Sequence, residues 1–209
     1  MYIMKQAIIT KVTGPIDWDK IPSVAINKLV ETESTDITAA AQICYDENAL
    51  YLRLSAKETE IRAVETGPIG NPCEDSCLEF FFSPMEGDIR YFNFEMNVNT
   101  CLYLGLGSCV ADLTRLIPAE EEGNGTEFNF HPRANRDGEH WEVSYQIPYA
   151  FIRRFFPDFS VYSGKTMRAN FYKCADLTTV PHYLAWNPIT RKGSCVFHTP
   201  SDFGLLRFE

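Results

Sequence analysis

Hydrophobic and polar residues alternate with a period of two along most of this chain. In residues 49–56, three leucines point to one side of an extended segment, and Tyr51, Arg53 and Ser55 point to the other. Residues 41–45 repeat the pattern before the turn at 46–48, which predicts a β-hairpin with a three-residue loop. The pattern therefore predicts strands rather than helices for this part of the chain.

Further segments extend the same reading. Residues 78–82 form a nearly continuous apolar run, which predicts a central strand covered on both faces. Residues 91–98 show the clearest alternation, and residues 102–106, 140–147 and 167–172 continue it. Many short strands separated by turn residues predict an all-β fold, an antiparallel β-sandwich of the jelly-roll or immunoglobulin-like kind. No linker interrupts the pattern, so we expect one domain over residues 1–209.

One segment departs from the period of two. Phe151 and Phe155 are four residues apart, Pro148 precedes them and Pro157 follows. This spacing places both rings on one face of a helix, and the two prolines suit its start and end. We therefore expect one short helix at residues 149–156.

Charge and composition limit the partners. The 209 residues carry a net charge of −9, which argues against nucleic acid, because binding phosphate needs clustered Lys and Arg. No run approaches the roughly 18 apolar residues of a membrane span, so no membrane partner is expected. The seven cysteines cannot all pair within the chain. No signal peptide is visible, so we expect a cytoplasmic protein, or an extracellular one if a leader has been removed.

The polar positions of the predicted strands offer a candidate surface for a sugar. They comprise Tyr91, Asn93, Glu95 and Asn97 on one strand, and Arg168, Asn170 and Tyr172 on another. A sugar packs its C–H face on an aromatic ring and bonds its hydroxyls to polar groups in the plane of the sugar ring. A half-solvated antiparallel sheet shows similar polar positions without any ligand, so the pattern alone leaves both interpretations open.

Two motifs make the sugar interpretation more specific. The chain ends with Trp186-Asn187-Pro188 and then Phe197-His198-Thr199-Pro200-Ser201-Asp202-Phe203-Gly204, before a last strand. About a hundred residues upstream, residues 75–82 read Asp-Ser-Cys-Leu-Glu-Phe-Phe-Phe. In order and spacing, these segments resemble the family 9 carbohydrate-binding modules and their DOMON-like relatives.

The resemblance implies carbohydrate binding without catalysis, to a plant or microbial glycan or its oligosaccharides. It implies that Trp186 forms one wall of a sugar slot and that the Glu79 carboxylate accepts hydroxyl hydrogen bonds. The alternatives are that Trp186 is an ordinary core residue and that Glu79 forms a salt bridge with an arginine on a neighbouring strand. The second tryptophan wall of the family is missing at residues 71–74. The expected ligand-binding residues are Trp186, Glu79, Asn93, Glu95, Arg168 and Tyr172.

Other functions stay open at this point. Glu79 and Glu95 could form a glycosidase pair, and family 9 modules accompany glycoside hydrolases such as xylanases, but we expect no catalytic residue. A haem-binding DOMON-type module would use methionine or histidine ligands, for which Met96, Met167, His131 and His182 are available. A sandwich that serves only as an interaction module is a further alternative. We expect a monomer.

We expect no required cofactor. The resemblance implies that structural calcium is an option, with Asp17, Asp19, Asp112 and Asp202 in predicted turns as candidate ligands. Cys73 and Cys77 lack the Cys-x-x-Cys spacing of most zinc sites, so the pattern favours small core residues over metal ligands.

Overall fold

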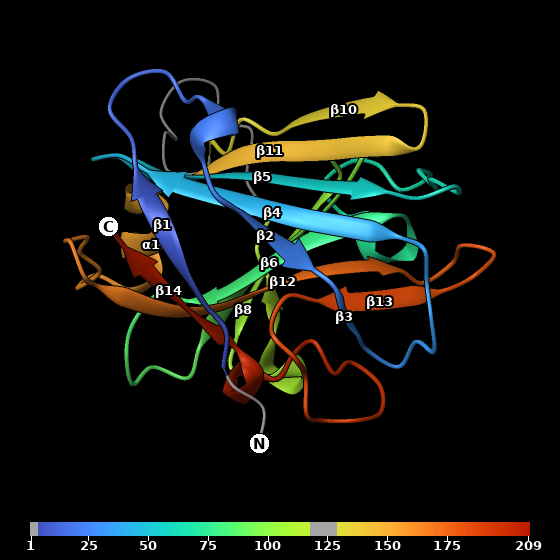
Figure 1. The fold of residues 1–209 in the computed structure, drawn as a ribbon. Helices are drawn as coiled ribbons and strands as arrows, with labels where there is room; N and C mark the ends of the chain where they lie inside the picture. Colours follow the sequence, from blue (N-terminus) through green and yellow to red (C-terminus); the bar gives the residue numbers. More distant parts are fainter. Residues whose placement is uncertain (1–3, 118–128) are drawn as a thin grey trace.

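The fold, taken from a computed structural model that describes residues 4–117 and 129–209, is a sandwich of two twisted β-sheets (Figure 1). The first sheet contains β10 (Arg133–Asp137), β11 (His140–Pro148), β5 (Ala49–Lys57), β4 (Thr38–Tyr45) and β2 (Ser23–Ile26) in that spatial order. All of these neighbours pair antiparallel, and the hairpin of β4 and β5 has its predicted turn at residues 46–48.

The second sheet carries the surface of interest. Its order is β14 (Gly204–Phe208), β12 (Thr166–Ala175), β6 (Cys77–Ser83), β7 (Tyr91–Asn97), β8 (Leu102–Gly107) and β9 (Thr114–Arg115). A branch of β13 (His182–Ala185) and β3 (Lys28–Leu29) extends from β12. The predicted all-β sandwich is confirmed. Within the described residues, no helix is long and apolar enough to cross a membrane.

One strand joins the two sheets. The first four residues of β1 (Gln6–Lys11) pair parallel with β14, and its last two residues pair parallel with β4. The alternating pattern cannot reveal this parallel pairing, because it does not depend on the direction of the neighbouring strand. Short 3-10 helices lie at Trp18–Lys20, Pro72–Glu74, Val110–Asp112 and Pro200–Asp202.

The core lies between the sheets and is dominated by aromatic rings. The Phe80 ring stacks on Phe82 and on Phe171, each at 4.9 Å between ring centroids. The predicted helix is confirmed as α1 (Tyr149–Phe155), whose Phe151 ring meets that of Phe92 at 5.0 Å. Proline at the start and an apolar face toward the core suffice to fix this short helix.

Every residue of β6 is buried, as its apolar run predicts. Leu78, Phe80 and Phe82 face the core, so alternation directs Cys77, Glu79 and Phe81 to the opposite, outer face of the second sheet. This outer face is covered as well. A segment of irregular backbone at residues 187–203, here called the closing segment, packs Val196, Phe197 and Phe203 against it.

The polar side of β7 is not the half-solvated face that its alternation suggests. Tyr91, Asn93, Glu95 and Asn97 are all buried, because the closing segment and the loop before β6 contact the outer face. Asn97, for example, donates to the Asp75 carboxylate at 2.7 Å and to the Glu65 carbonyl at 2.9 Å. The outer face of the second sheet is therefore buried, and polar side chains make up part of it.

The core packing makes a direct stability prediction. Phe80→Ala should lower the free energy of unfolding by about 3–5 kcal/mol, because it removes a fully buried ring that two others stack on. Ile89→Ala is the control, because its side chain is 72% exposed and its effect should stay within about 0.5 kcal/mol. Urea unfolding monitored by circular dichroism gives both values, and equal losses would contradict the assigned core.

Candidate functional site

A cavity of about 420 Å³ lies between the outer face of the second sheet and residues 193–198 of the closing segment. Its volume falls within the roughly 300–1,000 Å³ typical of small-molecule sites. The sheet contributes Glu79 from β6, Glu95 from β7 and Cys174 from β12. Asp176 and Tyr183, on either side of the turn that follows β12, form another part of the wall.

Strand register explains why the two glutamates meet. Glu79 is the direct partner of Glu95 on β7, and Tyr172 of β12 is the partner of Glu79 on the other side. Side chains at such paired positions have Cβ atoms about 4.5–5.5 Å apart. The register therefore aligns three of the predicted ligand-binding residues in one row across three strands.

The two glutamate side chains of this row are almost completely buried. Glu79 is 2% exposed and Glu95 is 7% exposed. Burial, followed by the charge of neighbouring Glu95, raises the pKa of Glu79 well above its ordinary value. Burial and the charge of Asp176 raise the pKa of Glu95 to about 8, although a 2.7 Å hydrogen bond from the Asn93 amide opposes the shift. Burial therefore favours the protonated form of both carboxyl groups, which donates as well as accepts hydrogen bonds.

The aromatic part of the cavity comes from β13 and the closing segment. Tyr183 is half-buried in the wall, and burial together with the nearby Asp176 carboxylate raises its pKa to about 12. Its ring meets Phe197 edge-on, at 6.1 Å between centroids. Phe197 in turn stacks flat on Tyr172 at 4.1 Å and 11°. A ligand in the cavity would therefore meet a rigid aromatic side next to the carboxyl groups.

Hydrogen bonds hold the closing segment in place. The Asn170 side chain accepts from the Asn187 backbone N–H at 2.8 Å and donates to its carbonyl at 3.1 Å. Arg168 donates to the carbonyls of Ser201 and Phe203, at 2.9 and 2.7 Å. The Tyr172 hydroxyl donates to the Phe197 carbonyl at 3.0 Å. These polar side chains satisfy backbone groups of an irregular segment that has no strand partner of its own.

The six predicted ligand-binding residues thus divide into groups. Glu79 and Glu95 line the cavity. Asn93 is fully buried and positions Glu95, while Arg168 and Tyr172 bind the closing segment rather than facing the cavity. Register and alternation bring these five onto one face, but the sequence does not reveal which of them the closing segment covers.

Trp186 requires a correction. Its side chain is only 3% exposed, packs edge-on to Phe171 in the core, and lies where a Cβ on Gly204 would contact the indole at 2.6 Å. Alternation explains the position, because Trp186 follows β13 in step with core-facing Leu184, whereas Tyr183 and Ala185 point outward. Trp186 therefore has no free ring face for a sugar, and the expected wall role is wrong in this conformation.

The cavity residues that the sequence analysis did not select for ligand binding include Asp176, Tyr183, Cys174, Cys73, Phe197 and His198. Cys174 and Tyr183 carried a usable signal, because each alternates onto the outer face of its strand. The sequence of the closing segment carried no such signal, because its irregular backbone has no periodicity. The aspartates expected for calcium form no common group in the described part of the chain, where Asp17 and Asp112 cap 3-10 helices and Asp202 binds Thr190. Calcium binding stays a prediction.

The candidate haem ligands have other surroundings. Met96 and Met167 are part of the core between the sheets, and His131 is exposed. His182 belongs to a buried polar cluster, in which the Lys173 ammonium lies 3.1 Å from the Glu58 carboxylate and 2.9 Å from His182 Nε2. Trp141 is buried in the core and its indole N–H donates to Glu58 at 2.6 Å. These contacts give each of the buried candidates a structural role.

Comparisons with known proteins agree with this architecture. Residues 11–208 match the family model described as carbohydrate-binding family 9. A protein from Bacteroides uniformis, provisionally named as carbohydrate-binding, is 30% identical with a TM-score of 0.77, over 99% of this chain and 100% of that one. A family 9 module from Caldicellulosiruptor kristjanssonii in complex with glucose has a TM-score of 0.65 at 14% identity, covering 98% and 96% of the two chains.

A second structure of a family 9 module from the same organism, in complex with cellotriose, has a TM-score of 0.64 at 13% identity and covers 98% and 94% of the two chains. None of the curated proteins matches this sequence. At such identities the two Caldicellulosiruptor structures support the fold, whereas the family match and the Bacteroides protein extend over nearly the whole chain.

His198 at the rim of the cavity makes stability depend on pH. Its Nδ1 lies 2.7 Å from the Tyr91 hydroxyl, and burial lowers its pKa from 6.5 to about 4. The unfolded chain therefore takes up a proton before the folded one, so His198 should reduce stability progressively as pH falls from about 6.5 to 4. The variant His198→Asn keeps an acceptor for the Tyr91 hydroxyl. It should reduce the slope of the unfolding free energy against pH by the equivalent of up to one bound proton.

The measurement is the unfolding free energy of wild type and variant across pH 4–8. His140→Asn on β11 is the matched control, because that side chain is exposed and distant in sequence from the cavity. If the unfolding free energies of wild type and His198→Asn differ by the same amount at pH 5 and at pH 7.5, the assignment of a neutral, buried imidazole is contradicted.

Proposed function

Because the chain belongs to carbohydrate-binding family 9, we propose that it binds a carbohydrate in the cavity between the outer face of the second sheet and residues 193–198. The observation that carries this proposal is the pairing of Glu79 with Glu95 inside the cavity, beside the half-buried ring of Tyr183. Carboxyl groups supply hydroxyl partners, and the ring supplies an apolar surface for a C–H face of the sugar.

The proposed ligand is a plant or microbial glycan or one of its oligosaccharides. Glucose and cellotriose are the first sugars to test, because the Caldicellulosiruptor family 9 modules were solved with them. The surface of the cavity is mostly apolar, and burial raises the pKa of its Glu79 and Glu95 carboxyl groups, that of Glu95 to about 8. This environment suits a neutral sugar, which needs hydrogen bonds rather than ion pairs.

The properties of the two glutamates suit the binding of a carbohydrate better than its hydrolysis. A retaining glycosidase needs one ionised carboxylate as nucleophile and one protonated carboxyl as acid. Here burial raises the pKa of both groups, and Glu95 changes charge only near pH 8. An environment that favours the protonated form of both carboxyl groups is poorly suited to supply the ionised nucleophile. The role of an accessory module or protein in a glycoside hydrolase system remains compatible with this reading.

Calorimetric titration with glucose and cellotriose tests the proposal. With Tyr183 as the accessible aromatic wall, we expect a dissociation constant of about 10 µM to 1 mM, or roughly −4 to −7 kcal/mol. Tyr183→Ala should weaken binding by about 1–2 kcal/mol through lost stacking and apolar contact. Glu95→Gln should weaken it less, since an amide keeps a donor and an acceptor at that position.

Tyr162→Ala serves as the matched control, because it removes an exposed tyrosine that does not line the cavity. Trp186→Phe tests the corrected assignment and should leave the affinity of the folded protein unchanged. If Tyr183→Ala and Tyr162→Ala have equal affinities, or if Trp186→Phe alone abolishes binding in a folded protein, the cavity is not the site.

A further inference from the structure

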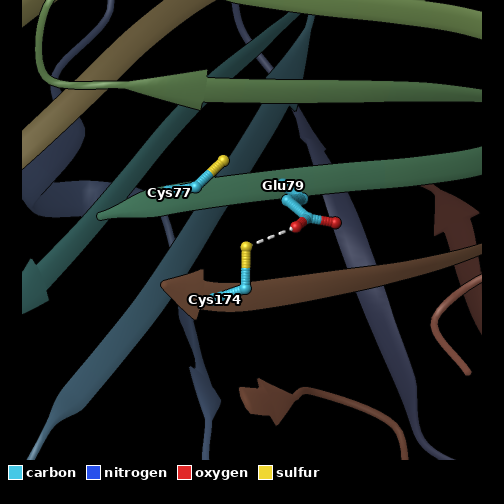
Figure 2. A group of neighbouring side chains, drawn as sticks. All are labelled: Cys77, Glu79 and Cys174. Atoms are coloured by element: carbon cyan, nitrogen blue, oxygen red, sulfur yellow. Dashed lines mark hydrogen bonds between the residues drawn. The ribbon is translucent and has the colours of Figure 1, made fainter. Parts of the chain in front are cut away.

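Three potential metal ligands converge at the floor of the cavity (Figure 2). Cys77 and Glu79 are two residues apart on β6, so both side chains project from the outer face of the sheet. Cys174 on β12 is the direct register partner of Cys77. One ligand atom from each residue lies within 4.8 Å of the others, and the Cys174 thiol donates to Glu79 Oε1 at 2.9 Å.

This cluster differs from an ordinary buried cysteine. A core thiol is normally a small apolar residue, as Cys44 is in the hairpin of the first sheet. At Cys77 and Cys174, two thiols and a carboxyl group face one another, and all three are at most 2% exposed. Two thiols and a carboxyl group placed together in this way can give up their protons to present three anionic ligands to a divalent ion.

The donor set indicates which cation fits. Two sulfur ligands favour a soft or borderline ion such as Zn²⁺, whereas Ca²⁺ and Mg²⁺ require shells of oxygen ligands. Zinc–sulfur bonds of about 2.3 Å and zinc–oxygen bonds of about 2.0–2.2 Å require donors to stand a few ångströms apart, as these do.

A metal ion also has a path to these residues. Glu79 and Cys174 line the cavity, and so does Cys73, whose carbonyl lies 3.8 Å from the Cys174 sulfur. Three protein ligands leave one position of a tetrahedral zinc site for a water molecule from the cavity. The site therefore combines ligand identity, spacing and access, the properties that a zinc site requires.

We propose that Cys77, Glu79 and Cys174 form a binding site for a thiophilic divalent cation, with Zn²⁺ as the best fit and a cavity water as fourth ligand. On binding, the two thiols become thiolates and the protonated Glu79 carboxyl group becomes a carboxylate, and the released protons pass to solvent, so no oxidant or reductant takes part. The site does not depend on carbohydrate binding, although Glu79 links it to the sugar cavity.

The test is a zinc titration of the reduced, full-length protein in competition with a chromophoric chelator, followed by the absorption spectrum with Co²⁺. We expect one equivalent of zinc and a thiolate-to-cobalt charge-transfer band. Cys174→Ser and Cys77→Ser should each weaken zinc binding at least tenfold, and Glu79→Gln should weaken it too. Cys44→Ser is the matched control, because it removes a buried thiol outside the cluster and should change nothing.

The variant Cys109→Ser, which removes an exposed thiol outside the cavity, separates surface binding from the cluster. If that variant loses the zinc while Cys174→Ser keeps it, the proposal is wrong. Circular dichroism verifies folding, and Cys174→Ala replaces a misfolded serine variant. Should both misfold, the wild-type spectrum decides, because a cobalt complex without a thiolate band overturns the site. Sugar titration of the same samples shows whether carbohydrate binding fails independently.

Discussion

The attachment of the closing segment to the second sheet is the constraint on which the rest of the structure depends. Asn170 fixes the start of the segment through both polar atoms of its amide, and Arg168 fixes its end through two carbonyls. Between these anchors, Phe197 stacks on Tyr172. Without this cover, Phe81 and Tyr91 would expose their rings, and the cavity would lose the wall formed by residues 193–198.

The same attachment gives the cavity its chemistry. Covering the outer face removes Glu79 and Glu95 from water, and this raises the pKa of both carboxyl groups. It also forces the polar side chains of the covered face to find partners, as Asn93 does with Glu95 on the same strand. Burial thus produces the hydrogen-bonding groups proposed for the sugar and the close contact of thiol and carboxyl groups proposed for zinc. Glu79 is the residue that both proposals share.

Much of this could be predicted from the sequence, for physical reasons that particular residues show. The alternation in β7 correctly places Asn93 and Glu95 on the face opposite Phe92 and Phe94, because a strand directs successive side chains to opposite sides. The motif around Glu79 locates the cavity floor. Periodicity could not reveal that irregular backbone would cover that face, nor that the short strand before Trp186 would direct the indole inward. Contacts between segments far apart in the sequence decide both points.

Hydrogen–deuterium exchange of the full chain, with and without saturating cellotriose, tests the central claim that ligand binds beneath the closing segment. The claim predicts slower exchange at the backbone amides of residues 193–198 and on β6 and β7 around Glu79 and Glu95, with β4 and β5 of the first sheet unchanged. Slower exchange confined to β4 and β5, or binding that leaves residues 193–198 unprotected, would contradict it.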